Sequence, residues 1–204
     1  FELQGSLTVP RCAGINHADF SIDGRYAIFT CEFTGGVAKI DLVERKVLGY
    51  LQLILPGKLT KVVKGPDGRD ETICTTWKGM PQDIRASPDG KTWYIADMMS
   101  DGIYVVEVEL FAQIAYVKTS TGAHFLYPSR DGRKLYIANR GSNKIHAPPK
   151  GPGGVSVLDF ATRKIVAEWP IPGGGRPDTG NVSADGKQLW LPGRYEDAVS
   201  VTDT

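Results

Sequence analysis

Short apolar runs recur along this chain of 204 residues, and polar turn residues separate them. The runs are rich in β-branched and aromatic side chains, which favour strands over helices. No stretch shows the 3.6-residue period of an amphipathic helix. The clearest runs occupy equivalent places in a repeated pattern: Tyr26–Cys31, Thr92–Asp97, Lys134–Asn139 and Gln188–Pro192. The pattern therefore predicts an all-β protein in which helix is almost absent.

Each of these runs follows a Ser-x-Asp-Gly sequence and precedes a second apolar run that ends in an acidic residue. The Asp-Gly pairs predict hairpin turns, because glycine accepts a positive φ and aspartate hydrogen-bonds to its own backbone. The turn aspartates are Asp23, Asp89, Asp131 and Asp185, and the acids that end the second runs are Asp41, Glu107, Asp159 and Asp203. The separations between paired members are 18, 18, 28 and 18 residues, so the chain contains an internal repeat.

The repeat predicts four antiparallel strands in each unit, one before the Asp-Gly turn and three after it. Four-stranded units of about 40–45 residues are typical of β-propeller blades. We expect residues 1–204 to form a single β-propeller domain or a segment of one, with residues 1–9 as a d-type fourth strand. A closed four-bladed ring stays open as an alternative, and a segment of a larger ring is the preferred interpretation. The expected blades are approximately 13–53, 81–118, 122–171 and 177–204.

Two insertions interrupt the repeat, at residues 54–79 and 143–153. The first is expected to form a β-hairpin around a Pro-Asp-Gly turn, with strands near Lys58–Lys64 and Glu71–Cys74. The second, which contains His146, is rich in proline, and the stiff backbone suits a fixed lid or recognition loop. A tolerated surface insertion is the alternative.

Two of the units carry a more specific signature. Ser87–Lys91 (Ser-Pro-Asp-Gly-Lys) precedes Trp93–Ala96, and Gly141–Lys144 follows Tyr136–Asn139. These motifs resemble the YVTN repeat family of β-propellers, which is related more distantly to haem-d-type nitrite reductase and lactonase propellers. The resemblance implies a seven-bladed ring to which this chain contributes four blades. It also implies an extracytoplasmic location, whether periplasmic, secreted or at the cell surface. The first unit departs from the pattern at Ile22.

If the four strands of a blade are called a to d in chain order, a d–a loop leads into each blade and a b–c loop joins its second and third strands. Polar residues occupy equivalent positions in these loops from one blade to the next. In a propeller these loops gather at one face around the central channel, and the residues there must supply the chemistry. Arginine offers a planar donor group suited to carboxylate or phosphate. We therefore predict a rim that binds a small anionic or polar ligand, or a protein partner. A ring of residues that only hold channel waters is the alternative. The predicted rim residues are Asn16, His17, Glu32, Gln82, Asp83, His124, Arg140, Asp178 and Arg194.

His17 and His124 are candidates for a second kind of chemistry. Either could ligate haem iron or a divalent metal, or act as a general base near neutral pH. Their positions in the repeat differ by one residue, so we do not expect them to point the same way. We predict no cofactor and no metal, and keep ligation by these two histidines as an alternative.

Composition narrows the range of partners. The formal net charge of +1 provides no basic excess, which argues against nucleic acid. No window approaches the roughly 18 apolar residues of a membrane span. Cys12, Cys31 and Cys74 lack a metal-binding spacing, so buried free thiols are expected, with a Cys12–Cys31 disulfide as the alternative.

Taken together, these features predict a binding or protein-interaction scaffold without catalysis of its own. The competing hypothesis is a propeller enzyme that uses the rim histidines, either a haem- or metal-dependent oxidoreductase or a lactonase.

Overall fold

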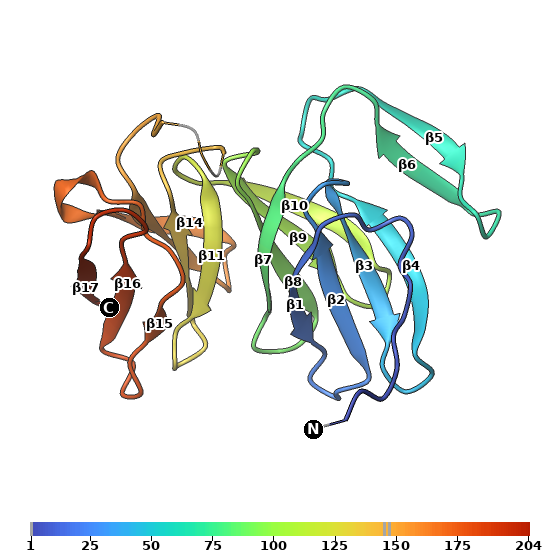
Figure 1. Ribbon diagram of the computed structural model, residues 1–204, viewed down its shortest axis with the longest axis horizontal. Coiled ribbons are helices and arrows are strands. Elements are labelled where there is room, and N and C mark those ends of the chain that lie inside the picture. The colour runs from blue at the N-terminus through green and yellow to red at the C-terminus, as the bar shows by residue number, and fades with distance from the viewer. Residues whose placement is uncertain (1, 145, 147) are drawn as a thin grey trace.

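The computed structural model describes residues 2–144, 146 and 148–204 and consists of antiparallel β-sheets arranged side by side (Figure 1). The first blade contains β1 (Ile15–Phe20), β2 (Tyr26–Cys31), β3 (Gly36–Asp41) and β4 (Lys46–Gln52). The second contains β7 (Pro81–Ala86), β8 (Thr92–Asp97), β9 (Gly102–Glu107) and β10 (Ala112–Lys118). The third contains β11 (Ala123–Pro128), β12 (Lys134–Asn139), β13 (Gly154–Asp159) and β14 (Lys164–Pro170). The fourth contains β15 (Asn181–Val182), β16 (Gln188–Pro192) and β17 (Val199–Asp203).

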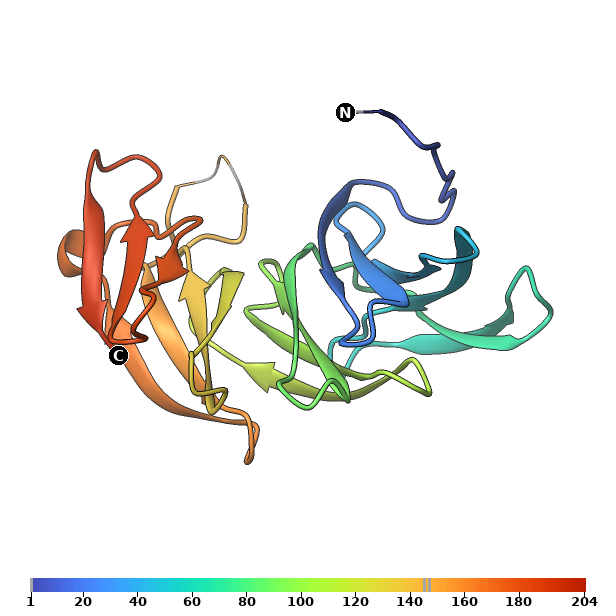
Figure 2. The same cartoon turned by 90° about the horizontal axis from the view of Figure 1, so that it is seen from below.

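The blades form part of a ring, as Figures 1 and 2 show from two directions. The first strand of each blade lies innermost, and β1, β7, β11 and β15 follow one another around the arc. A short 3₁₀ turn at Pro172–Gly174 is the helical structure within the described residues. The predicted all-β propeller architecture is therefore confirmed, and the chain is a partial ring.

Apolar side chains between neighbouring sheets form the core. Ile28 of the first blade packs with Trp93 and Tyr104 of the second, and all three are essentially inaccessible to solvent. Similar buried clusters lie between the second and third blades and between the third and fourth. Because these three apolar clusters are each shared by two sheets, neighbouring blades stabilise one another.

The Ser-x-Asp-Gly turns all share one hydrogen-bond pattern. In the first, the Ser21 hydroxyl donates to Asp23 at 2.6 Å, and the Gly24 N–H donates to the Ser21 carbonyl at 2.9 Å. The Arg25 N–H donates to Asp23 at 3.0 Å, and Gly24 has a φ of 69°, a left-handed conformation that glycine adopts without strain. The other three turns repeat these contacts. The motif thus builds the lower edge of the arc in Figure 1, whereas the d–a and b–c loops lie at the upper edge.

Side chains from one inner strand reach the backbone of the next. Asp19 in β1 accepts the Ala86 N–H at 2.6 Å, and Asp83 in β7 accepts the Leu126 N–H at 2.9 Å. At the third junction the Tyr127 hydroxyl accepts the Gly180 N–H at 2.7 Å. Each pair of neighbouring blades is therefore joined by a polar link as well as by apolar packing.

The first insertion forms the predicted hairpin, with β5 (Thr60–Lys64) paired antiparallel to β6 (Asp70–Cys74). It projects beyond the blades at the upper edge (Figure 1). In the second insertion, residues 145 and 147 lie outside the described residues, and the lid or recognition-loop hypothesis stays a prediction.

The prediction of a d-type strand over residues 1–9 is wrong for the part that the structure describes. Residues 2–9 form no strand, although the Gln4 carbonyl accepts a hydrogen bond from Arg45 at 3.2 Å. A strand needs a partner edge, and none of the described sheets pairs with these residues. The segment therefore runs along the first blade as irregular chain.

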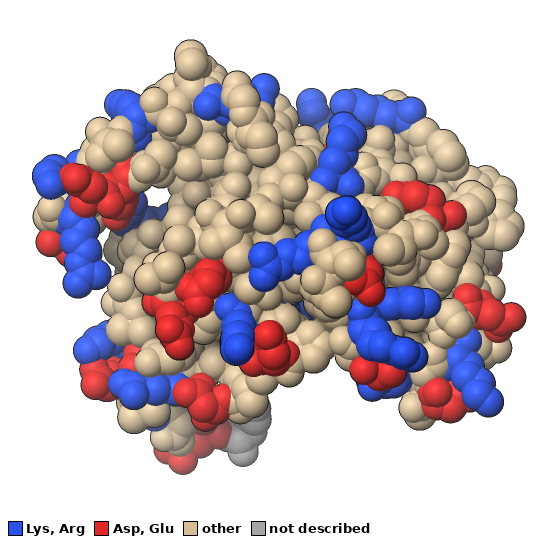
Figure 3. All heavy atoms as spheres, turned by 180° about the vertical axis from the view of Figure 1, so that it is seen from behind, with Lys and Arg blue, Asp and Glu red and all other residues tan. Residues whose placement is uncertain are grey.

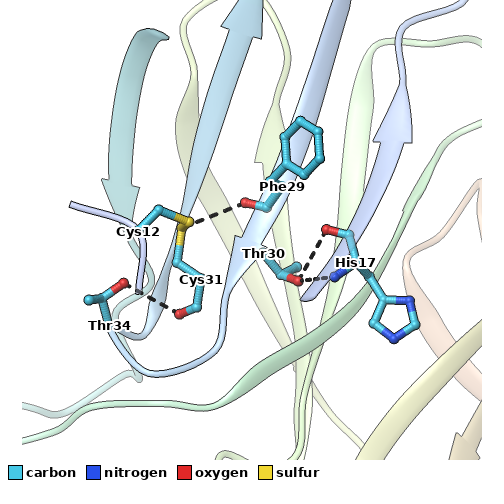
Figure 4. Close-up of a disulfide and its surroundings, with 6 residues drawn as sticks. All are labelled: Cys12, His17, Phe29, Thr30, Cys31 and Thr34. Carbon is cyan, nitrogen blue, oxygen red and sulfur yellow. Dashed lines mark hydrogen bonds between the residues drawn. A yellow bond between two sulfur atoms is a disulfide. The ribbon is translucent and has the colours of Figure 1, made fainter. Parts of the chain in front are cut away.

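The expectation of free thiols is corrected for two of the three cysteines. Cys12 and Cys31 form a disulfide, which ties the segment before β1 to the end of β2 (Figure 4). Both cysteines pack against Ala38 in a small buried cluster. Sequence alone could not decide this pairing, because it depends on how the loop before β1 folds back. Cys74 is a buried free thiol, as expected.

Candidate functional site

The predicted rim begins with a contact triangle between the first and second blades. The Asn16 side-chain amide donates to Gln82 at 3.2 Å and to Glu32 at 3.5 Å. The Gln82 amide in turn donates to Glu32 at 3.1 Å. The alignment of the repeats therefore places these three residues together correctly, across a separation of 66 residues.

The middle of the rim is centred on Asp83. Its carboxylate is fully buried and lies 3.5 Å from the His17 Nδ1 atom and 2.6 Å from an Arg85 nitrogen. Burial raises the pKa of Asp83, and the positive charge of Arg85 and the backbone hydrogen bond from Leu126 oppose that rise. Because its oxygens are occupied by backbone and side-chain donors, Asp83 serves to connect blades and to hold His17 in place. The His17 ring packs edge-on against Phe125, with 5.2 Å between centroids.

The far part of the rim joins the third and fourth blades through Asp178. One Asp178 oxygen accepts a hydrogen bond from Arg140 at 2.6 Å, and the other accepts one from Arg194 at 2.9 Å. Burial favours the neutral acid, but the hydrogen bonds and positive charges of the two arginines lower the pKa of Asp178 overall. With one acid between two guanidinium groups, this cluster carries a surplus of positive charge.

His124 lies beside this cluster and is 5% exposed. Burial, followed by the positive charge of Arg140, lowers its pKa to about 2, so the imidazole is neutral near pH 7. The His124 Nδ1 and Arg140 Nε atoms are buried and lack a hydrogen-bond partner within the described part of the protein. Buried polar atoms are usually paired, so these two atoms are the rim's clearest unsatisfied hydrogen-bonding groups.

The structure thus brings all nine predicted rim residues into one chain of neighbours that runs across four blades. Both His17 and His124 contact the Phe125 ring, with centroid distances of 5.2 and 4.3 Å, respectively. Within the ranges that the structure covers, no group of three or more His, Cys, Asp or Glu is arranged to hold a metal ion.

Sequence reasoning missed several residues next to the rim. Tyr195 lies between two arginines, with its ring 5.0 Å from the Arg176 guanidinium carbon and 5.7 Å from that of Arg194. Arg85, which pairs with Asp83, lies outside the aligned loop positions. The position of Tyr195 directly after Arg194 in a b–c loop is the one signal that could have indicated it.

Two surface properties complete the description. Acidic and basic side chains are interspersed on the back of the molecule, without a continuous basic patch on the face that Figure 3 shows. None of the described helical structure is long and apolar enough to cross a membrane.

Comparison with known proteins agrees with this architecture. The family model for the YNCE-like beta-propeller matches residues 70–204. A solved structure from Bacteroides uniformis, provisionally described as a 6-phosphogluconolactonase, aligns over 98% of this chain with a TM-score of 0.62 and 20% identity. A similarly described structure from Bacteroides fragilis aligns over 97% with a TM-score of 0.56 and 18% identity. Hydrazine synthase from Kuenenia stuttgartiensis aligns over the whole chain with a TM-score of 0.51 and 18% identity.

The chain spans 55%, 69% and 67% of the lengths of these three structures, respectively. No curated protein sequence matches it. At these identities the structural matches establish the fold alone.

Proposed function

Because the chain belongs to the YNCE-like β-propeller family, we propose that it is an extracytoplasmic binding scaffold that holds a small anionic ligand at its rim. The observation that carries this proposal is the pair of buried, unpartnered atoms, His124 Nδ1 and Arg140 Nε. A ligand oxygen near Arg140 would accept its free N–H. The positive charge left over around Asp178 would favour a carboxylate or phosphate over a neutral group.

Binding is favoured over catalysis by the state of His124. A general base works best when its pKa lies near the working pH, and a pKa of about 2 makes His124 a weak base at neutrality. As a neutral side chain beside Arg140, it is better suited to a hydrogen bond with a bound ligand.

The extracytoplasmic location is supported by the Cys12–Cys31 disulfide. Disulfides persist in oxidising compartments and are rare in the cytosol, where thiols are kept reduced. This support is independent of the rim, so the two parts of the proposal can fail separately.

Isothermal titration calorimetry tests the binding proposal with two probes, inorganic phosphate and 6-phosphogluconate, which carries both a phosphate and a carboxylate. Arg140→Lys keeps the charge but loses the planar donor, and we expect it to weaken binding by about tenfold. Arg194→Lys tests the same cluster at a partly exposed position. The control is Arg133→Lys, an 80% exposed side chain in a turn on the opposite edge, which should not change the affinity.

Absence of heat from both probes with the wild-type protein would contradict the proposal. So would equal losses in Arg140→Lys and Arg133→Lys. Near-ultraviolet circular dichroism of each variant separates a lost site from lost packing.

A lactonase-type enzyme is the competing proposal, favoured by the descriptions of two structural neighbours. Hydrolysis of 6-phosphogluconolactone, followed by proton release, distinguishes it from a scaffold. Under our proposal the rate with protein equals the rate without it. A saturable rate that His124→Ala abolishes would favour the lactonase instead.

A further inference from the structure

The two arginines of the proposed anion site already hold a carboxylate that belongs to the protein. Arg140 Nη2 donates to one oxygen of Asp178 at 2.6 Å, and Arg194 Nη1 donates to the other at 2.9 Å. Hydrogen bonds between charged partners are stronger than those between neutral ones. An external anion that uses the same nitrogen atoms must therefore compete with Asp178.

Asp178 reaches the arginines from the loop that leads into the fourth blade. Its backbone is anchored there, because the Asp178 N–H donates to the Pro192 carbonyl at 2.9 Å and the Tyr127 hydroxyl donates to the Asp178 carbonyl at 3.2 Å. The side chain extends from this fixed point and is 18% exposed. Rotation of the side chain between staggered conformations can therefore move the carboxylate away from the arginines while the loop keeps its place.

The contacts of Asp178 differ from those of Asp83, the acid that links the second and third blades. Asp83 is fully buried, and its oxygens accept the N–H groups of Ile84 and Leu126, each at 2.9 Å. Within the described residues, the Asp178 carboxylate accepts hydrogen bonds from arginine side chains and from no backbone N–H. Asp83 is thus fixed by the backbone of two strands, whereas Asp178 is held by side chains that can exchange partners.

Asp178 also leaves part of the Arg140 donor group unused. A guanidinium presents its N–H groups in one plane, and an oxyanion commonly accepts two of them side by side. Asp178 contacts Arg140 through Nη2, and the Arg140 Nε atom is buried and lacks a partner in the described part of the protein. An oxyanion that is not tethered to the loop can accept both groups. Arg140 is therefore better matched to a free oxyanion than to Asp178.

Arg194 is the arginine that an ion from solution meets first. Its side chain is 35% exposed, whereas that of Arg140 is 5% exposed. The Arg194 Nε atom donates to the Tyr195 hydroxyl at 3.2 Å, which orients the guanidinium. An incoming anion can pair with Arg194 at the surface and then take the place of Asp178 beside Arg140.

We infer that Asp178 is an internal competitor for the anion site, so that an external oxyanion binds by displacing its carboxylate from Arg140 and Arg194. This inference rests on the proposed function, since it assigns the ligand to the same arginines. A tethered group competes as if it were dissolved at a concentration on the order of millimolar. Asp178 thereby sets the affinity that a ligand must exceed. A phosphate monoester, with a charge of about −1.5 to −2 near pH 7, is favoured over a single carboxylate.

Isothermal titration calorimetry with inorganic phosphate tests the competition. Asp178→Asn removes the charge and nearly keeps the shape of the side chain, and we expect it to bind phosphate at least about tenfold more tightly than the wild type. The matched control is Asp70→Asn, because the Asp70 carboxylate is 65% exposed and pairs with Lys64 at 2.6 Å, in the β5–β6 hairpin. This control should leave the affinity unchanged.

A second experiment replaces the carboxylate from solution. Asp178→Ala leaves the buried Arg140 guanidinium without its anion, and a formate ion should take the position of the missing carboxylate. Formate should therefore raise the thermal unfolding midpoint of this variant, because a ligand that binds the folded state stabilises it. Chloride at equal ionic strength should have a smaller effect, and neither salt should distinguish Asp70→Ala from the wild type.

The outcomes separate this inference from the proposed function. Phosphate binding by the wild type without a gain in Asp178→Asn would overturn the internal competition and leave the anion site standing. Binding by Asp178→Asn alone would support the competition and contradict the proposal that the wild-type protein holds the ligand. Equal responses of Asp178→Ala to formate and chloride, or no response to either, would also overturn the inference.

Discussion

Replacing His124 with asparagine should make the protein less sensitive to acid. His124 is 5% exposed and its pKa is lowered from 6.5 to about 2, so the folded state resists protonation while the unfolded state accepts a proton below pH 6.5. A group of this kind destabilises the folded state as the pH falls from the unfolded pKa towards the folded pKa. Each pH unit in that window costs about 1.4 kcal/mol, so lowering the pH from 7 to 4.5 removes about 2.5 kcal/mol through this residue.

Urea unfolding followed by tryptophan fluorescence at pH 7 and pH 4.5 measures the effect. Acidic residues also lose stability in acid, so the informative quantity is the difference between the wild type and His124→Asn in their change with pH. His124→Asn should lose about 2.5 kcal/mol less than the wild type. The exposed His146→Asn provides the control and should behave like the wild type. An equal loss in the wild type and His124→Asn would refute the reasoning that His124 is held neutral by burial and by Arg140.

Three further predictions concern stability. Asp83→Ala should cost about 3–5 kcal/mol in urea unfolding, because it leaves both Arg85 and the Leu126 N–H of the next blade without their buried partner. A loss below about 1 kcal/mol would mean that the inter-blade link is weak. Cys12→Ser removes the disulfide and should lower the free energy of unfolding by about 3 kcal/mol. A reductant should shift the midpoint of urea unfolding of the wild type but not that of Cys12→Ser. Gly24→Ala should lower the free energy of unfolding by about 1 kcal/mol, because Gly24 has a φ of 69° that alanine adopts only with strain. No atom lies within 4 Å of the added methyl group, so a steric clash does not contribute. An unchanged thermal unfolding temperature would show that the turn relaxes.

The fold was predictable because the same turn motif recurs in every blade, so that one local pattern indicates how all four blades are built. A Ser-x-Asp-Gly turn fixes a hairpin from its own side chains, as the contacts of Ser21 and Asp23 show, and these need no distant partner. Residues 2–9 failed as a strand for the opposite reason, because strand formation depends on an edge elsewhere. The Cys12–Cys31 bond likewise depends on a loop path that no periodicity specifies.

The rim was predictable in position but less so in the role of each residue. Counting from the turns brought Asn16, Gln82 and Asp178 to the correct end of their blades, although Asn16 and Gln82 lie within the first strands and only Asp178 lies in a loop. It could not show that Asp83 is enclosed by Arg85 and the Leu126 backbone, because the direction of a side chain depends on the neighbouring strand. Nor could it show that His124 is neutral, since burial is a property of the assembled blades.

The polar links between inner strands have a consequence for how such a ring can change in length. At each junction the acceptor belongs to one blade and the backbone N–H to the next, as with Asp19 and Ala86 or Asp83 and Leu126. The first strand of a blade carries both the acceptor side chain for one junction and the backbone N–H for the other. A copied blade therefore brings one partner of the polar link to each of its two junctions. Duplication of such a blade would carry both partners of this polar link into the new junctions.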